Sequence, residues 1–153
     1  MYQTEAGIAQ RIEEDHTLLH KHIASLIAEM NRTIEPESFS HWKLDFLWEL
    51  RDFHNQLLKH FDLEEEGGLR EDVTRLAPQF VFRYEMLEED HGKIVADLNH
   101  VLDVVKGIDA PDSPRIERVN NRINDVIKLL QAHERDVDSL LQEVYCQEYG
   151  RGN

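Results

Sequence analysis

The chain has 153 residues, which is the size of a single domain with one sizeable core. Its 31 acidic and 17 basic residues leave a formal net charge of −14, which disfavours nucleic acids and anionic membranes, because both bind positively charged surfaces. The single Cys146 excludes an intramolecular disulfide and suits a reducing compartment. No apolar run approaches the roughly 20 residues that span a bilayer, and no signal peptide is recognisable, so a cytoplasmic location is expected.

The first predicted helix covers residues 4–32, where apolar side chains recur at steps of three and four. It should end before Pro36, since proline disrupts a helix interior. Ser38 or Ser40 could cap the next helix by accepting a hydrogen bond from its first free N–H groups. The second predicted helix covers residues 39–66 and carries the same kind of apolar stripe.

The second half of the chain continues this pattern. The second helix stops at Gly67-Gly68, a strong C-terminal signal, and residues 69–77 are expected to make a short helical turn. Further apolar stripes predict a third helix that begins at or just after Pro78 and ends at Gly107, and a fourth that opens with Asp112 or Ser113 as its cap and fades at Gly150. Four amphipathic helices with short connections predict an all-α, up-down-up-down antiparallel four-helix bundle, with residues 1–153 as one domain.

Nine histidines need placing, and helical projection puts one on the inward-facing side of each predicted helix. Two carboxylates share these faces. One lies a turn after the histidine of the second helix, and the other lies five residues after the histidine of the fourth helix. The six residues are His16, His60, Glu64, His91, His133 and Asp138. Such groups are costly in an apolar interior unless a metal ion or a neighbouring hydrogen bond satisfies them. The four histidines would lie at one depth along the bundle if residues 69–77 extend past the second helix and cap the end of the bundle.

The order of these residues resembles the hemerythrin-like, or HHE cation-binding, family over essentially the whole chain. That family has a His on the first helix, His-x-x-x-Glu on the second, His-x-x-x-His on the third and His-x-x-x-x-Asp on the fourth. The resemblance implies two non-haem irons bridged by two carboxylates and an oxo or hydroxo group, and manganese or zinc is the alternative metal. The implied ligands are His16 and His60 on one iron, His91 and His133 on the other, and Glu64 and Asp138 as bridges.

One position departs from the family pattern. Where the family has a second His one turn after the third-helix His, this chain has Val95. Glu88 or His20 could replace the missing ligand, or the position could stay open to water. An open position favours reactive or sensing chemistry over reversible oxygen carriage. Glu65 is a candidate partner for an imidazole N–H.

The resemblance implies a protein that binds, senses or reacts with dioxygen, peroxide or nitric oxide. Binding or sensing is favoured over an oxidase or peroxidase-type activity. A different class of function is a metal-free helical bundle that serves as an interaction or regulatory module, with its inward His and Glu satisfying one another. A ferritin-like oxidase ranks last, because it would use two Glu-x-x-His pairs.

Leu44 and Trp48 form an apolar pair on the side of the second helix opposite its stripe. Exposed apolar neighbours one turn apart can mark a partner surface, so a homodimer through this face is one interpretation. The other is that Tyr2 or residues 69–77 cover the pair.

Overall fold

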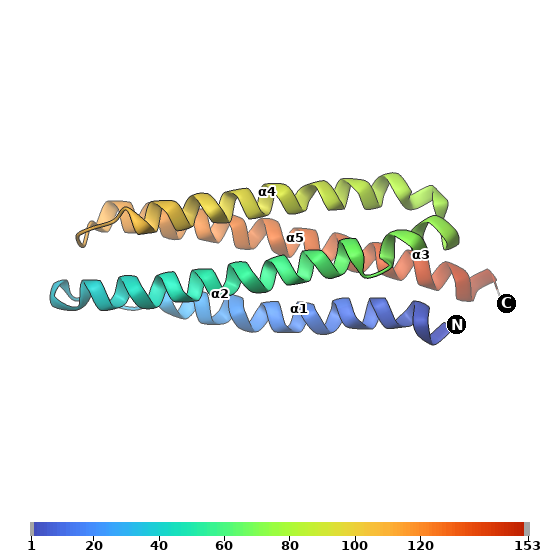
Figure 1. Ribbon diagram of the computed structural model, residues 1–153, viewed down its shortest axis with the longest axis horizontal. Helices are drawn as coiled ribbons and strands as arrows, with labels where there is room; N and C mark the ends of the chain where they lie inside the picture. The colour runs from blue at the N-terminus through green and yellow to red at the C-terminus, as the bar shows by residue number, and fades with distance from the viewer. Residues whose placement is uncertain (1, 152–153) are drawn as a thin grey trace.

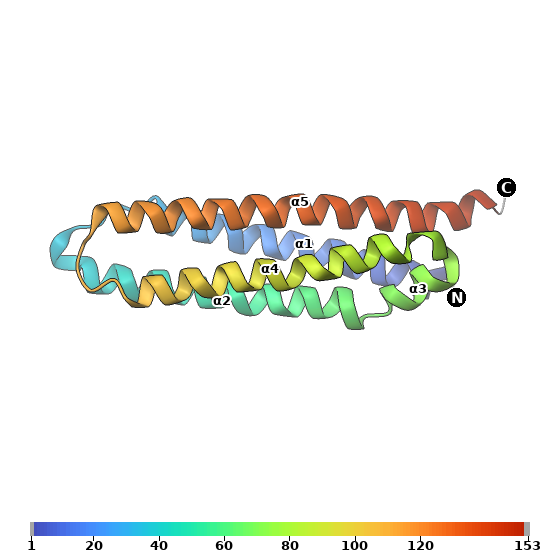
Figure 2. The same ribbon diagram turned by 90° about the horizontal axis from the view of Figure 1, so that it is seen from above.

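The computed structural model describes the backbone of residues 2–151 and the side chains of residues 7–146. Within these residues the chain is helical, without strands. The helices are α1 (Tyr2–Met30), α2 (Phe39–Glu66), α3 (Leu69–Leu76), α4 (Val81–Lys106) and α5 (Ser113–Arg151), with short 3₁₀ turns at Pro36–Ser38 and Pro78–Phe80. Figures 1 and 2 show α1, α2, α4 and α5 side by side along the long axis, with the chain turning back at each connection. The predicted all-α bundle is confirmed.

The helix ends follow local chemistry, with two differences from the prediction. Asp112 Oδ1 accepts a hydrogen bond of 3.1 Å from the backbone N–H of Arg115, which caps α5. Ser38 occupies the N-cap position of α2, but its hydroxyl donates to the Glu35 carbonyl and therefore does not cap the helix. Pro78 opens a 3₁₀ turn, so α4 begins three residues later than this proline.

Gly67 and Gly68 turn the chain from α2 into α3. A Cβ atom on Gly67 would lie 2.3 Å from the Leu63 carbonyl oxygen and 2.7 Å from Cδ1 of Ile8, which is closer than packed atoms approach. Gly68 has a φ of +105°, a backbone conformation that favours glycine. The two glycines therefore allow α3 to start immediately beside the end of α2.

Two clusters of buried apolar side chains hold the bundle together, and on α1, α4 and α5 the inward histidine lies between them along the chain. On α1, His16 falls between Ile12 of one cluster and Leu19 of the other. On α4, His91 likewise lies between Leu87 and Ile94, and on α5 the order of the clusters is reversed, with His133 between Leu130 and Val137. Because both apolar clusters are buried, the polar histidine layer between them is held at one position along the long axis of the bundle.

Helix α3 closes the end of the bundle where α1 begins and α5 ends (Figure 1). It contacts all four long helices and buries Leu69, Val73 and Leu76. This agrees with the expectation that residues 69–77 cap that end. The segment does not cover Leu44 and Trp48, whose exposed fractions are 67% and 71%. No helix among the described residues is both long enough and apolar enough to cross a bilayer.

Candidate metal centre

Five buried donor side chains from the four long helices meet inside the bundle. Each residue exposes 6% of its surface or less. The donors are His16 on α1, His60 and Glu64 on α2, His91 on α4 and His133 on α5. They form two groups, His16–His60–Glu64 and Glu64–His91–His133, in which one donor atom per residue lies within 4.8 Å of the others. Glu64 belongs to both groups.

The group on the α4–α5 side cannot be explained by hydrogen bonds alone. Glu64 Oε1 lies 2.9 Å from Nε2 of His91 and 3.1 Å from Nε2 of His133, and the two nitrogens are 3.1 Å apart. A hydrogen bond joins one donor to one acceptor, so the three contacts of this triangle cannot all be hydrogen bonds at once. A cation bound by these residues would accept all three lone pairs. These donors therefore fit a metal ion.

The group on the α1–α2 side has the same character. Nε2 of His60 lies against Oε2 of Glu64, and the rings of His60 and His16 have centroids 4.7 Å apart. Among the described residues, His16 Nε2 is buried without a hydrogen-bond partner, and His60 Nε2 and Glu64 Oε2 are buried with no partner beyond their contact with each other. A buried polar atom left unsatisfied costs about 1–3 kcal/mol, so the buried Nε2 of His16 beside this pair needs an explanation. A bound cation supplies one.

Each of the four histidines turns its other ring nitrogen, Nδ1, toward a carboxylate. The distances are 2.7 Å from His60 to Asp15, 3.2 Å from His16 to Asp138, 3.3 Å from His91 to Glu65 and 3.6 Å from His133 to Asp90. The contact of His60 is a hydrogen bond, and the other three are longer polar contacts. A carboxylate behind Nδ1 holds the proton there and leaves the Nε2 lone pair facing inward, as metal-binding histidines require.

Local interactions set the protonation of the donors. Burial by itself would raise the pKa of the Glu64 carboxyl, but its contacts with His133, His60 and His91 outweigh burial and hold that pKa well below its ordinary value. Burial, together with the neighbouring His60, lowers the pKa of His16. Burial also acts to lower the pKa of His60, but its contacts with Glu64 and Asp15 raise it overall. A cation would therefore compete with a proton mainly at His60.

Three side chains proposed as ligands from the sequence lie outside both groups. Asp138 is 52% exposed and contacts Nδ1 of His16, because five residues along a helix place it roughly 140° from His133. Glu88 accepts a hydrogen bond of 2.8 Å from Arg70. His20 Nε2 lies 2.8 Å from Oε2 of Glu134. Neither Glu88 nor His20 therefore replaces the donor that is missing at Val95.

Sequence reasoning missed three carboxylates that the structure brings to the site. Asp15 and Asp90 each directly precede an inward histidine, but each contacts a histidine on another helix. The recurring Asp-His dipeptide was the available signal. Glu134 is 5% exposed, and its Oε1 is buried with no hydrogen-bond partner among the described residues. Its position immediately after His133 was the only indication.

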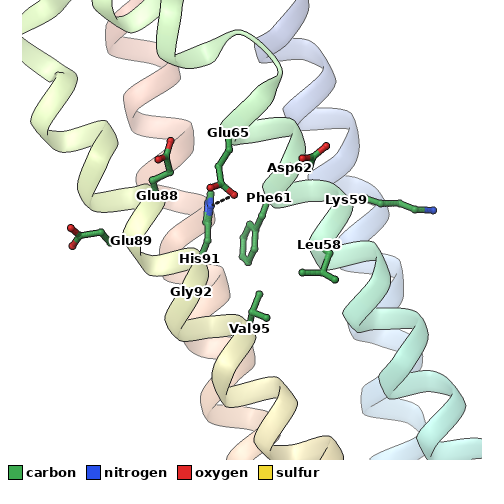
Figure 3. A pocket seen from close by; sticks show the side chains of 10 residues that line it. All are labelled: Leu58, Lys59, Phe61, Asp62, Glu65, Glu88, Glu89, His91, Gly92 and Val95. Carbon is green, nitrogen blue, oxygen red and sulfur yellow. Dashed lines mark ion pairs between the residues drawn. The ribbon is translucent and has the colours of Figure 1, made fainter.

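A cleft of about 800 Å³ lies between α2 and α4 on the solvent side of His91 (Figure 3). Val95 lines this cleft together with Phe61, whose ring stacks on His91 with centroids 3.9 Å apart and planes inclined by 13°. The stacked Phe61 fixes the plane of the imidazole. It also places hydrocarbon between part of the cleft and the buried donors.

The donor set combines four imidazole nitrogens with the oxygens of one shared carboxylate. Such mixed nitrogen and oxygen sites suit divalent metals such as iron, manganese or zinc, whereas an all-thiolate site would indicate structural zinc or iron–sulfur chemistry. These buried groups could hold a metal ion. Compared with protein-family models, curated proteins and solved structures, the chain matches none.

Proposed function

We propose that this chain is a hemerythrin-like, up-down-up-down bundle that holds two non-haem iron ions and binds, senses or reacts with dioxygen or a related small oxidant. The observation that carries the proposal is the sharing of one buried carboxylate, Glu64, by two groups of histidines. His16 and His60 would hold one ion, and His91 and His133 the other. When bound, a pair of irons supplies sites that can exchange electrons with dioxygen, peroxide or nitric oxide.

The number of donors favours reactive or sensing chemistry over reversible oxygen carriage. Each group contains three residues, and no other carboxylate or imidazole within the described residues joins either group. Val95 contributes no donor beside His91, and Glu88 is held by Arg70. A centre with few protein ligands keeps room for a small exogenous molecule. The apolar clusters on both sides exclude bulk water from it.

The test is elemental analysis of protein purified without added metal, combined with an absorption spectrum in air and in azide. We expect about two irons per chain and a near-ultraviolet band that azide changes, because an exogenous ligand can enter an open coordination position. His60→Ala and Glu64→Ala should lose the iron. His22→Ala is the matched control, since His22 contacts Asp52 and belongs to neither group. Iron content that survives both substitutions would contradict the proposal.

A further inference from the structure

The cleft between α2 and α4 has a polar end and an apolar end (Figure 3). Asp62, Glu65 and Glu88 gather toward the end nearer α3, whereas Leu58 and Val95 lie toward the other. His91 is the only member of the two donor groups that lines the cleft. A molecule in the cleft would therefore lie beside the candidate metal centre without displacing the other four donors.

The polar end carries uncompensated negative charge. Four carboxylates and one ammonium group line the cleft, and Figure 3 shows the ammonium of Lys59 pointing away from it. Glu88 is neutralised by Arg70, and Glu65 contacts His91. Asp62 is exposed and has no ion pair or hydrogen bond with any side chain that the structure describes. Asp62 and Glu65 lie three residues apart on one face of α2, so a positive charge between them would interact with both.

The apolar end offers accessible hydrocarbon surface and free space. Leu58 is 42% exposed and lines the cleft. A Cβ atom added to Gly92 would meet nothing within 4 Å, so the cleft stays open at the α4 wall. Binding sites for small molecules are commonly apolar concavities with a few polar groups that fix orientation. This cleft has that composition.

We infer that the cleft binds a small organic cation, an amine with an attached aromatic or hydrocarbon group. The ammonium lies between Asp62 and Glu65, and the apolar part packs against Leu58, Phe61 and Val95. An anion of the same shape is repelled by the carboxylates, and a neutral analogue gains only the apolar contact. This binding site goes beyond the proposed iron centre and does not require it.

The test is isothermal titration calorimetry with 2-phenylethylammonium, 2-phenylethanol and 3-phenylpropionate at physiological salt. We expect saturable binding of the ammonium probe and much weaker binding of the other two. Asp62→Asn should lower the affinity for the ammonium probe about fivefold, which is the contribution expected of one partly exposed ion pair. Val95→Phe should lower the affinity for the same probe by a larger factor, because the added ring fills the apolar end of the cleft.

Glu117→Gln is the matched control, since Glu117 is exposed on α5 and does not line the cleft. It removes one charge from a chain of formal charge −14 and should leave the affinity unchanged. Equal weakening by Asp62→Asn and Glu117→Gln would overturn the inference, because it would show diffuse attraction only. Equal affinity for all three probes, or full affinity in a folded Val95→Phe variant, would overturn it as well. The iron content of the same samples tests the proposed function separately.

Discussion

Asp15 shows how a single carboxylate on one helix determines the chemistry of a histidine on another. Its Oδ2 lies 2.7 Å from Nδ1 of His60, and its Oδ1 accepts a hydrogen bond of 3.1 Å from Gln56. The amide of Gln56 holds the carboxylate in place, and the carboxylate in turn orients the imidazole. Asp15 is therefore a positioning residue whose effect should appear in metal affinity.

Asp15→Asn should lower the affinity for iron about 10- to 100-fold, because the amide no longer favours the proton on Nδ1 of His60. A competition titration against a chelator measures this change. Asp52→Asn is the control, because Asp52 makes the same kind of contact with His22, outside both donor groups. Equal affinities in the two variants would show that the carboxylate behind His60 has no such role.

Asp138→Asn separates two roles for an aspartate that the sequence suggested as a bridging ligand. In the structure this side chain supports Nδ1 of His16 from a half-exposed position. The substitution should therefore weaken binding about tenfold or more while the chain still takes up its full complement of metal. Metal content measured at saturation decides the question. Loss of one ion per chain at saturation would instead show direct ligation by Asp138.

The residues of this site were predictable to different degrees, for physical reasons. The period of the α-helix is enough to place His60 and Glu64 on one buried face, and the structure buries both. The same period leaves Asp138 at the edge of its stripe, so its partner depends on how α5 lies against α1. The contact between Asp15 and His60 joins two helices, and no spacing within one helix can indicate it.

The junction between α2 and α3 shows the same limits at the scale of elements. Gly67-Gly68 predicted the end of α2 correctly, because glycine both ends helices and permits a positive φ. The close approach of Ile8 to Gly67 could not be predicted, since it depends on the packing of α1 against the end of α2. The start of α4 was placed too early because Pro78 suits a 3₁₀ turn as well as a first helical turn.

Gly67→Ala should destabilise the fold by about 1–3 kcal/mol, because the new methyl group overlaps the Leu63 carbonyl and Ile8. Urea unfolding followed by circular dichroism measures the loss. Gly92→Ala serves as the control, because its Cβ meets nothing within 4 Å and the residue lies inside α4. That variant should gain roughly 0.5–1 kcal/mol from its better helix propensity. Similar stabilities for the two variants would refute the steric argument.

On the face shared by α1 and α2, Glu49 lies among other carboxylates. Partial burial raises the pKa of the Glu49 carboxyl, and the neighbouring charges of Glu29 and Asp52 raise it further. The folded protein then binds this proton more tightly than the unfolded chain, so ionisation of Glu49 as the pH rises reduces stability.

Glu49→Gln should consequently raise the free energy of unfolding by roughly 0.5 kcal/mol at neutral pH, a value reduced by solvent screening. The gain should vanish below about pH 4, where the wild-type carboxyl is protonated in both states. Thermal melts from pH 3 to 8 in low and high salt check this, since salt should shrink the difference. A gain that is independent of pH would have another cause.

The whole bundle is organised as two apolar clusters separated by the layer of histidines and carboxylates. Several buried nitrogen and oxygen atoms of this layer have no hydrogen-bond partner among the described residues. The apolar clusters must therefore compensate for its cost. A ligand that binds only the folded layer stabilises the entire molecule by linkage.

Removal of metal with a chelator should therefore lower the melting temperature, and addition of ferrous iron should restore it. The expected loss is about 2.7 kcal/mol when the free metal had been 100 times its Kd. Differential scanning calorimetry of the wild type and of Glu64→Ala measures it, and the variant should not respond to the chelator. An unchanged melting temperature in the wild type would favour the metal-free interaction module.

The shared position of Glu64 has a consequence for how the centre fills. Within the described residues it is the only carboxylate in either donor group, so a first dication would give the five donor side chains together a net positive charge. In a low-dielectric interior the second dication then enters against repulsion, unless further carboxylate oxygens turn inward. The two ions would thus occupy the protein in succession, with singly loaded chains prevailing when iron is scarce and doubly loaded chains when it is abundant.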